Sequence, residues 1–414
     1  MENWSKIRIN EARFRQDFEA LSQIGATWDG GVHRPALSEA HLAARAWFRE
    51  NAERAGLQVV VDGAGNHSAV LSSPGPGAKT VLLGSHLDSV PHGGRFDGAL
   101  GALAALEVLR TVSEAGLELP VNLEAVDFTD QEGTLVNHLG SFAFTGRLTP
   151  EDLANPPGGR SALKDGLRRA GLDEKGILAA GRNLEEVAAY LELHVEQGSQ
   201  LERCGFPLGV VSSITGISLY RLTFTGRADH AGSRAMADRL DAGQGASLFA
   251  LSARELVLEE FPSCMVNVGD MRFSPGTFNT VPERVEVSLE FRAPNDQQLA
   301  LLEKSLLSEA RRAAEVFGLR LEVDSLGTRR PAEMDSAVQA AIESAAGSLG
   351  LKYTSLVSGP GHDARSFAGR VPTGMIFLPS VGGAFHTPRE HIEWEHCVNG
   401  ANTLLQTALR VSLN

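Results

Sequence analysis

The 414-residue sequence has little cysteine, no basic excess and no long apolar run. Its only cysteines are Cys204, Cys264 and Cys397, and their odd number and wide spacing argue against a disulfide framework or a cysteine-based zinc site. The formal net charge of −13 argues against a nucleic-acid partner. The chain opens without the apolar block of a signal peptide, and no run of 18 apolar residues follows. We therefore expect a reduced cytoplasmic protein with neither a nucleic-acid nor a membrane partner.

The length and the hydrophobic pattern predict two domains, because 414 residues exceed one ordinary core. Continuous apolar strands such as "KTVLLGSHLDSV" alternate with helical stretches such as "GALGALAALEVLRTVSEAG", which is typical of an α/β layer architecture. Near Ser212 the pattern changes to half-exposed strands, "ITGISLYRLTFTGRA" and "RVEVSLEFRAP", each followed by a long helix. "GMIFLPSV" then resumes the first pattern. We predict an α/β domain with a mixed or parallel sheet, residues 1–211 and 329–414, and an inserted α+β sandwich with one open face, residues 212–328.

Candidate metal ligands begin in "GSHLDSVPHGGRFDGALG". His86 and Asp88 follow a buried strand, at the edge where α/β sheets tend to place their sites. Imidazole and carboxylate suit Zn, Mn, Co or Ni, and we expect the Asp88 carboxylate to accept the second ring N–H of His86. Asp97 lies in a Gly-rich loop that could bring its carboxylate to a second strand end. By itself, a His-x-Asp pair is more often part of a solvated loop.

Three more strand ends offer ligands of the same kind. Glu132 follows "PVNLEAVDF", His194 lies in "LELHVEQGSQLE", and His386 comes after "GMIFLPSV". Each residue alone is more often structural than functional, but four strand ends that all carry His, Asp or Glu favour a metal site. Two cations bridged by one carboxylate would need about five protein ligands and leave a position for water.

With these motifs the chain resembles the dinuclear-metal amidohydrolases of the metallopeptidase superfamily. It is most similar to the hydantoinase/carbamoylase branch of N-carbamoyl-L-amino-acid hydrolases, β-ureidopropionases and allantoate amidohydrolases. The resemblance runs from "ALSEAHLAARAWF" to "HTPREHIEWE", and "SHLDSVPHGGRFDGALG" and "HVEQGSQLE" are its most specific motifs. It implies a mixed-sheet, zinc-exopeptidase-like catalytic domain with an inserted dimerisation (lid) domain. It also implies two divalent ions per subunit (Mn, Zn, Co or Ni), one on His86 and His194, the other on Glu132 and His386, with Asp97 bridging them.

The resemblance also implies substrate-binding groups in the inserted domain. His230 of "GRADHAGSRAMADRLDA" would reach a neighbouring subunit of a homodimer and polarise the scissile carbonyl. Asn279 and Arg292 of "FNTVPERVEVSLEFR" would clamp a substrate carboxylate, for which the planar Arg fork is well suited. Without the resemblance, a helix-entry His, a turn Asn and a surface ion pair would be the simpler interpretations. The other positions implied to bind substrate are Gln197, a donor to the group being cleaved, and the backbone at Gly359 and Gly361 in "SGPGHDAR".

The stretch "VDFTDQEGT" departs from the family pattern of two consecutive glutamates. The ligand is kept as Glu132, but Gln131 occupies the position of the glutamate that shuttles a proton, and an amide cannot do this at neutral pH. General base catalysis typically contributes 10²- to 10⁴-fold in rate, so its loss should matter. The family usually has Arg and Phe where this chain has Leu135 and Val136. Phe385 and Pro360 replace small residues, and the bulk of Leu135 and Phe385 hints at a flat or aromatic group near the metals.

Three functions follow from these observations. The first is a metal-dependent homodimeric hydrolase of a non-peptide C–N bond in a small carboxylate-bearing molecule, of the N-carbamoyl amino acid type by default. In this enzyme Gln131 would only orient the attacking water. The second is a hydrolytic deaminase or amidase of an aromatic carboxylate, and the third is a catalytically silent protein that binds a metal or a ligand.

Overall fold

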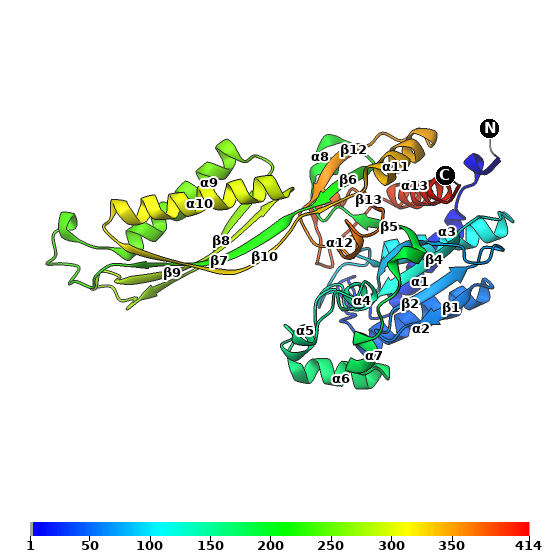
Figure 1. Cartoon of the computed structure of the whole chain (residues 1–414), viewed down its shortest axis with the longest axis horizontal. Helices are drawn as coiled ribbons and strands as arrows, with labels where there is room; N and C mark the ends of the chain where they lie inside the picture. Colours follow the sequence, from blue (N-terminus) through cyan, green and yellow to red (C-terminus); the bar gives the residue numbers. More distant parts are fainter. Residues whose placement is uncertain (1–2, 414) are drawn as a thin grey trace. The chain divides into compact units, whose positions relative to one another are not determined.

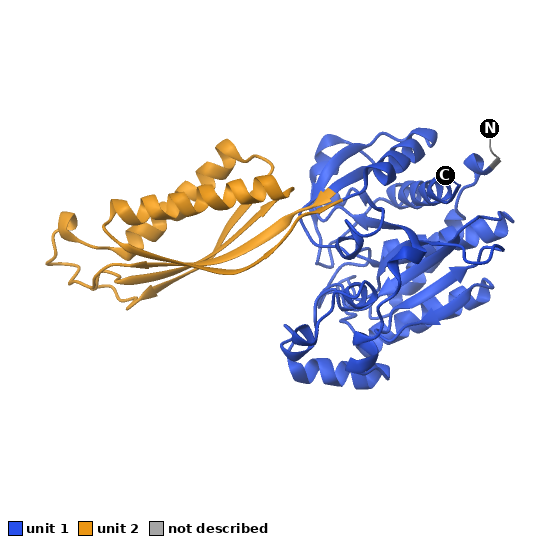
Figure 2. Cartoon of the chain, in the orientation of Figure 1, with its two compact units in different colours: residues 1–212, 334–414 blue, residues 213–333 orange. Residues whose placement is uncertain are grey.

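The computed structural model describes residues 3–413 and divides the chain into two compact units (Figure 2). Unit 1 contains the residues up to 212 and those from 334 onward, and unit 2 contains residues 213–333. The chain therefore leaves unit 1 once and returns to it once. The boundary expected at residue 328 falls inside strand β10 (Arg320–Arg329) of unit 2.

A nine-stranded mixed sheet forms the centre of unit 1 (Figure 1). Its strand order is β1-β2-β4-β3-β5-β13-β6-β11, and β12 pairs with β6. Strands β4, β3, β5 and β13 run parallel, whereas β2 and β6 flank them in the antiparallel direction. The strands are β1 (Gln58–Val61), β2 (His67–Leu71), β3 (Thr80–His86), β4 (Asn122–Phe128), β5 (Val187–Val195), β6 (Gly209–Ile214), β11 (Ala332–Glu333), β12 (Thr354–Ser358) and β13 (Thr373–Leu378).

Five long helices complete the main hydrophobic core of unit 1. They are α1 (Glu11–Gln23), α2 (Glu39–Arg54), α3 (Ala99–Glu114), α11 (Ser336–Ser348) and α13 (Trp394–Leu413). Helix α3 is buried on nearly all sides, which explains why its sequence is apolar around its whole circumference. Shorter helices follow the strands: α4 (Leu139–Phe144), α5 (Pro150–Ala154), α6 (Arg160–Ala170), α7 (Glu174–Leu178), α8 (Gln200–Cys204) and α12 (Ala364–Phe367).

The parallel direction of the four central strands positions the candidate site. The carboxyl ends of β3, β4, β5 and β13 meet at one edge of the sheet, and this edge is where α/β proteins place their ligands. His86 is the last residue of β3, His194 is the last but one of β5, and Glu132 and His386 follow β4 and β13, so residues far apart in the sequence are brought to one place. The expected α/β class with a mixed sheet is confirmed.

Unit 2 is a four-stranded antiparallel sheet with two helices packed on it. The strand order is β10-β7-β9-β8, with β7 (Gly216–Thr225), β8 (Met265–Ser274) and β9 (Arg284–Ala293), and the helices are α9 (Ala242–Glu260) and α10 (Asp296–Val316). Alternate residues of β9, from Val285 to Phe291, are buried in the core that both helices share. The sequence predicted β7, β9 and both helices but not β8 and β10, whose side chains are too exposed to leave a clear apolar alternation.

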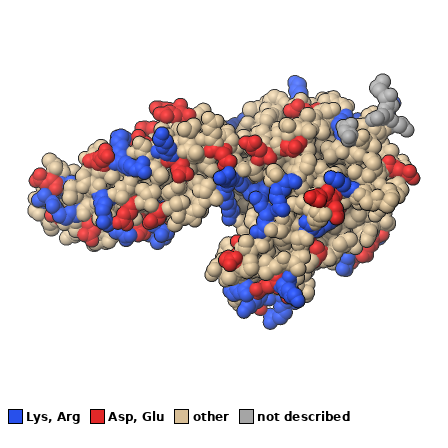
Figure 3. All heavy atoms as spheres, viewed as in Figure 1, with Lys and Arg blue, Asp and Glu red and all other residues tan. Residues whose placement is uncertain are grey.

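Ion pairs cover the opposite face of this sheet. Residues two apart on a strand share a face, and Arg272 pairs in this way with Asp270, and Arg284 with Glu286. Arg292 and Glu290 form a further pair of this kind near the end of β9. Figure 3 shows acidic and basic side chains interspersed over the visible surface of unit 2. This face is therefore polar, and Arg292 belongs to it.

No helix within residues 3–413 is both long enough and apolar enough to cross a membrane.

A buried ion pair fixes the strand ends that carry the site. The Arg45 guanidinium of α2 donates to the Asp127 carboxylate at 2.8 Å and to the Thr129 hydroxyl at 2.8 Å. The other carboxylate oxygen of Asp127 accepts the Leu87 amide at 2.7 Å, directly between His86 and Asp88. Both side chains of the pair are almost fully buried. Loss of either partner would leave a buried charge uncompensated.

We predict that Arg45→Met lowers the free energy of unfolding by about 3–5 kcal/mol, because Asp127 would remain buried without its cation. Arg49→Met, one turn further along α2, is the matched control, because Arg49 is exposed and lies 3.9 Å from Glu53. Its loss should cost at most about 1 kcal/mol. Urea denaturation followed by circular dichroism measures both values, and equal values for the two variants would contradict the role given to the buried pair.

Candidate metal centre

Five of the predicted ligands converge in two groups that share Asp97. The first group is His86, Asp97 and His194, and the second is Asp97, Glu132 and His386. In the first group, His194 Nε2 lies 3.2 Å and His86 Nε2 lies 3.9 Å from Asp97 Oδ1. In the second group, His386 Nε2 lies 3.2 Å from both Asp97 Oδ2 and Glu132 Oε2. Each group therefore faces a different oxygen of one carboxylate, which is the arrangement that two bridged cations require.

Hydrogen bonds to carbonyl groups set the tautomers of two imidazoles. His86 Nδ1 lies 3.0 Å from the Asp88 carbonyl oxygen, and His194 Nδ1 lies 3.0 Å from the Val195 carbonyl oxygen. A carbonyl only accepts, so both Nδ1 atoms carry a proton and both Nε2 atoms are left to face the site, where they could bind a metal when deprotonated. The Asp88 carboxylate, which we expected to accept the His86 proton, is 3.8 Å away and instead accepts the amides of Gln131 (3.3 Å) and Glu132 (3.2 Å). Asp88 is thus the partner of His86 that we expected, but it accepts through its backbone carbonyl and not through its carboxylate.

Gly98 lets helix α3 begin against the metal-ligand side chains. Its φ of 65° lies in the left-handed region, and an added Cβ would lie 2.3 Å from the His86 ring. A larger residue would therefore strain the backbone and displace His86. Asp97, immediately before Gly98, is held by its own amide, which donates to Glu390 Oε1 at 2.9 Å.

The polar atoms of the site fit a pair of cations. His86 Nε2, His194 Nε2 and Glu132 Oε1 are buried and have no hydrogen-bond partner in the described chain. Buried polar atoms are normally paired, so a ligand is expected between them. Two donor atoms that each lie about 2.0–2.2 Å from a tetrahedral ion are roughly 3.3–3.6 Å apart, close to the 3.2 Å separations seen here. Four of the ligands are largely buried, whereas the His386 side chain is 39% exposed, so the second group faces outward.

The charge balance within the group leads to the same conclusion. Burial opposes ionisation of Asp97, but the His194 and His386 rings outweigh it and hold the pKa of this carboxyl well below its usual value. Burial likewise opposes protonation of the two rings, yet Asp97 raises the pKa of His194 to about 9 and that of His386 to about 10. Without metal, protons therefore compensate the carboxylate. Divalent cations would displace them, so metal affinity should fall at acid pH.

Glu390 supports the site and was not identified from the sequence. Its Oε1 accepts the amides of Phe96 (2.8 Å) and Asp97 (2.9 Å), and burial together with the Asp97 charge raises its pKa to about 8. Gly94 leaves room for this carboxyl, because a Cβ there would lie 2.2 Å from it and would displace the Glu390 side chain. The motif "HTPREHIEWE" contains Glu390, but nothing local indicates that it binds a loop almost 300 residues earlier.

The loop after β4 is wound around the buried carboxylate of Asp130. This carboxylate accepts the amides of Leu135, Val136 and Asn137, and also the Thr134 hydroxyl. The turn presents Gln131, whose Nε2 donates to the Gly361 carbonyl at 3.0 Å. The side chains of Leu135 and Val136 point into a separate hydrophobic cluster with α4, α5 and α6. Leu135 is therefore no sign of an aromatic substrate, which corrects that interpretation, whereas Phe385 packs edge-on against His386 at 5.1 Å.

Gln197 and the Gly-rich loop adjoin the two groups. Gln197 Nε2 donates to both oxygens of Asp97 at 3.1 Å, and its backbone is left-handed, with φ of 55°. We expected it to contact the group being cleaved, and this structure assigns its amide to the shared carboxylate. Gly361 contributes the carbonyl that holds Gln131, and Gly359 lies two residues earlier in the same loop.

The three predicted residues of unit 2 lie in two places. His230 forms an isolated bridge with Thr280, and the Ala231 amide donates to the Asn279 carbonyl at 2.9 Å, so His230 and Asn279 are neighbours. Both lie beyond the end of the sheet where Arg284 pairs with Thr225. Arg292 lies at the other end of β9, where its Nε donates to Glu290 at 2.8 Å. The surface ion pair considered for Arg292 thus exists, in addition to any role in binding.

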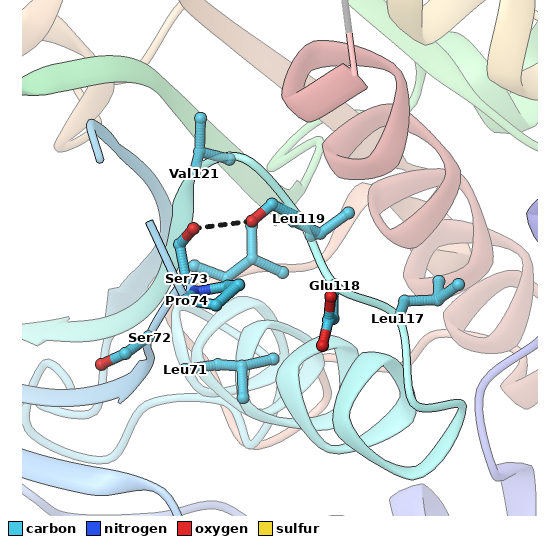
Figure 4. A pocket seen from close by; sticks show the side chains of 9 residues that line it. Leu71, Ser72, Ser73, Pro74, Leu117, Glu118, Leu119 and Val121 are labelled. Atoms are coloured by element: carbon cyan, nitrogen blue, oxygen red, sulfur yellow. Dashed lines mark hydrogen bonds between the residues drawn. The ribbon is translucent and has the colours of Figure 1, made fainter. Parts of the chain in front are cut away.

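A separate cavity of about 240 Å³ lies at the opposite edge of the unit 1 sheet (Figure 4). Leu71 and Leu123, which pair at the start of β4, both line it. Its Ser73 hydroxyl already donates to the Leu119 carbonyl at 2.7 Å, and Glu118 is the only ionisable group among its lining residues. None of the predicted site residues lines it, so it offers no support for the expected chemistry.

Comparison with known proteins agrees with this geometry. The model of peptidase family M20/M25/M40 matches residues 82–410. The N-carbamoyl-L-amino acid amidohydrolase of Geobacillus stearothermophilus is 34% identical over 406 residues, which cover 98% of this chain and 99% of that enzyme. The allantoate amidohydrolase of Bacillus subtilis (strain 168) is 31% identical over 382 residues, 90% of this chain and 91% of the enzyme. The crystal structure of a hydantoinase/carbamoylase family amidase from Burkholderia multivorans matches with a TM-score of 0.90 and 34% identity over 99% of each chain.

The resemblance inferred from the motifs is thereby confirmed. The matches span both units and include every segment that carries a predicted metal ligand. The chain therefore belongs to peptidase family M20/M25/M40, as a hydrolase of its hydantoinase/carbamoylase branch.

Proposed function

We propose that the protein hydrolyses a non-peptide C–N bond in a small carboxylate-bearing molecule, with N-carbamoyl amino acids as the substrate class. The observation that carries the proposal is the sharing of Asp97 between two groups of buried imidazole and carboxylate ligands. The relatives named N-carbamoyl-L-amino acid amidohydrolase and allantoate amidohydrolase support the same reaction type. The free state of Cys204, Cys264 and Cys397 is consistent with our further proposal that the enzyme works in the cytoplasm.

Two divalent ions bound by the five ligands would lower the pKa of a water molecule and polarise the substrate carbonyl. His86, His194 and Asp97 would hold one ion, and Glu132, His386 and Asp97 the other. Gln131, fixed by Gly361, would orient the attacking water through its side-chain oxygen. Gln131 cannot exchange a proton, so another group must accept the proton of the water.

Substrate binding in our proposal uses residues from two subunits. Arg284 and Arg292 are eight positions apart along strand β9, which corresponds to about 26 Å at 3.3 Å per residue. His230 and Asn279 lie beyond the Arg284 end. One small substrate therefore cannot contact Arg292 and His230 of the same unit 2. A homodimer, in which the partner subunit contributes His230 and Asn279, would bring the two sets together.

An aromatic carboxylate is the second candidate substrate class, and the enzyme would then act as a deaminase or amidase. Phe385 supports it, because its ring packs edge-on against His386 and its side chain is partly exposed beside this ligand. An aromatic ring of the substrate could stack there.

We predict that the wild-type protein binds two equivalents of Mn or Zn at saturation. His386→Ala should retain about one equivalent, since the first ligand group remains complete, whereas Asp97→Asn should weaken both sites. His391→Ala is the matched control, because His391 lies on the same segment but belongs to neither group. Elemental analysis after dialysis measures the stoichiometry. One equivalent in the wild-type protein would contradict the dinuclear assignment.

We further predict that a panel of carbamoyl-, acyl- and amino-substituted carboxylates, assayed with Mn, Zn, Co and Ni, contains a substrate whose turnover depends on Arg292. Arg292→Lys keeps the charge but loses the two parallel hydrogen bonds, so kcat/KM should fall at least about tenfold. Arg284→Lys, at the far end of β9, should have no such effect. Equal activity of the Arg292 variant, or of substrates whose carboxylate is amidated, would contradict the clamp.

A further inference from the structure

Two buried ionisable side chains beside Gln131 have no role in the function proposed above. Asp363 is fully buried, and neither of its carboxylate oxygens has a hydrogen-bond partner among the described residues. His138 is 4% exposed, and its Nδ1 likewise has no partner within that part of the chain. Nδ1 of His138 lies 3.7 Å from Oδ1 of Asp363. The two unsatisfied groups thus face each other.

Burial favours a direct interaction between His138 and Asp363, because neither group can be solvated where it lies. An unpaired carboxylate inside a protein is costly, and a shift of about 1 Å would turn the 3.7 Å approach into a charge-assisted hydrogen bond. The His138 ring is held for this contact by stacking on Phe142, with ring centroids 5.5 Å apart and planes 26° apart. With Nδ1–H toward Asp363, the basic Nε2 faces the opposite way. This orientation of a histidine by an aspartate is the arrangement used for proton transfer in hydrolases.

Nε2 of His138 lies against Gly361, the residue that also binds Gln131. A Cβ added to Gly361 would lie 3.2 Å from His138 Nε2, so the ring packs directly on this glycine. The carbonyl of Gly361 is also the acceptor of Gln131 Nε2 at 3.0 Å. His138 and Gln131 therefore contact the same residue, one that the family resemblance implies in substrate binding.

The backbone at His138 is strained. Its φ of 53° and ψ of 30° place a non-glycine residue in the left-handed region, directly after Asn137 with φ of 70°. Such a conformation is energetically unfavourable for a residue with a side chain and persists where the surroundings hold it, often at functional sites. Here the Asp130 carboxylate holds the loop by accepting the amides of residues 135–137.

The other ionisable groups around the pair already have hydrogen bonds. Glu192 accepts the Ser85 hydroxyl and the Ala364 amide, and Tyr190 donates to the Gly84 carbonyl. Nε2 of His362 lies 3.0 Å from the Ser358 hydroxyl, while its Nδ1 has no partner in the described chain. The His362 ring packs against the metal-site residue His194. Among these groups, only His138 has a carboxylate, that of Asp363, near its Nδ1 and a glycine, Gly361, against its Nε2.

We infer that His138, oriented by Asp363, carries the proton that Gln131 cannot carry. The inference rests on the proposed function. As the oxygen of the attacking water bonds to the substrate carbonyl carbon, one of its protons passes to His138 Nε2, directly or through one further water. The C–N bond then breaks, and His138 gives this proton to the departing nitrogen. His138 ends the cycle neutral, and only water is consumed.

The test compares His138→Asn with Gln131→Glu and with the double variant, using the best substrate of the panel. Asparagine tolerates the left-handed backbone, so the loop should keep its conformation. His138→Asn should lower kcat at least about 100-fold and remove the acid limb of its pH profile, with metal content and Tm unchanged. Gln131→Glu should restore most of the rate in the His138→Asn background, because a carboxylate again stands where the family has one. Asn137→Gly, in the same loop, is the matched control and should keep the wild-type pH profile.

A measurement independent of turnover follows the His138 ring itself. In ¹⁵N-histidine NMR of the zinc-loaded protein, His138 should be the Nδ1–H tautomer, and Asp363→Asn should shift this tautomer equilibrium. An unchanged kcat and pH profile in His138→Asn would overturn the inference and leave the proposed function standing. A loss that Gln131→Glu does not restore would also overturn it. Absence of turnover by the wild-type protein across the panel would refute the proposed function, and the inference with it.

Discussion

The carboxylate of Asp97 is the constraint on which the site depends. It is buried among three imidazoles and next to Glu132, so it must share its two oxygens between positive partners. The surrounding structure serves to hold it there. Glu390 binds the amides of residues 96 and 97, Gly98 allows α3 to begin against the His86 ring, and Gln197 donates to both carboxylate oxygens. The four parallel strands then bring the remaining ligands to the same edge of the sheet.

The loop after β4 carries the residue at which this chain departs from the family pattern of two consecutive glutamates. Glu132 stands in one of the two candidate ligand groups, while its neighbour Gln131 carries an amide that donates to the Gly361 carbonyl, at a position where the family resemblance implies a glutamate. In the same loop, a histidine in a strained conformation faces a buried carboxylate across 3.7 Å. We propose that the two features belong together, so that the proton moves through the His138 imidazole and not through a glutamate at position 131, with both side chains in contact with Gly361.

Much of this architecture was predictable from the sequence, because parallel strands place their carboxyl ends together and each central strand ends close to His, Asp or Glu. The strands β8 and β10 were missed because their exposed residues leave no apolar period. Glu390 and His138 were missed for another reason: their partners lie hundreds of residues away, and such contacts leave no local signal. The expectation about Leu135 failed because sequence position beside a ligand does not fix the direction of a side chain.

The most direct test of the account is a crystal structure of the manganese-loaded protein with anomalous diffraction. We predict two anomalous peaks per subunit, about 3.5–4 Å apart, each within bonding distance of a different oxygen of Asp97. His86 and His194 should bind one ion, and Glu132 and His386 the other. A single peak, or two peaks of which only one contacts Asp97, would contradict the claim that this carboxylate bridges two cations.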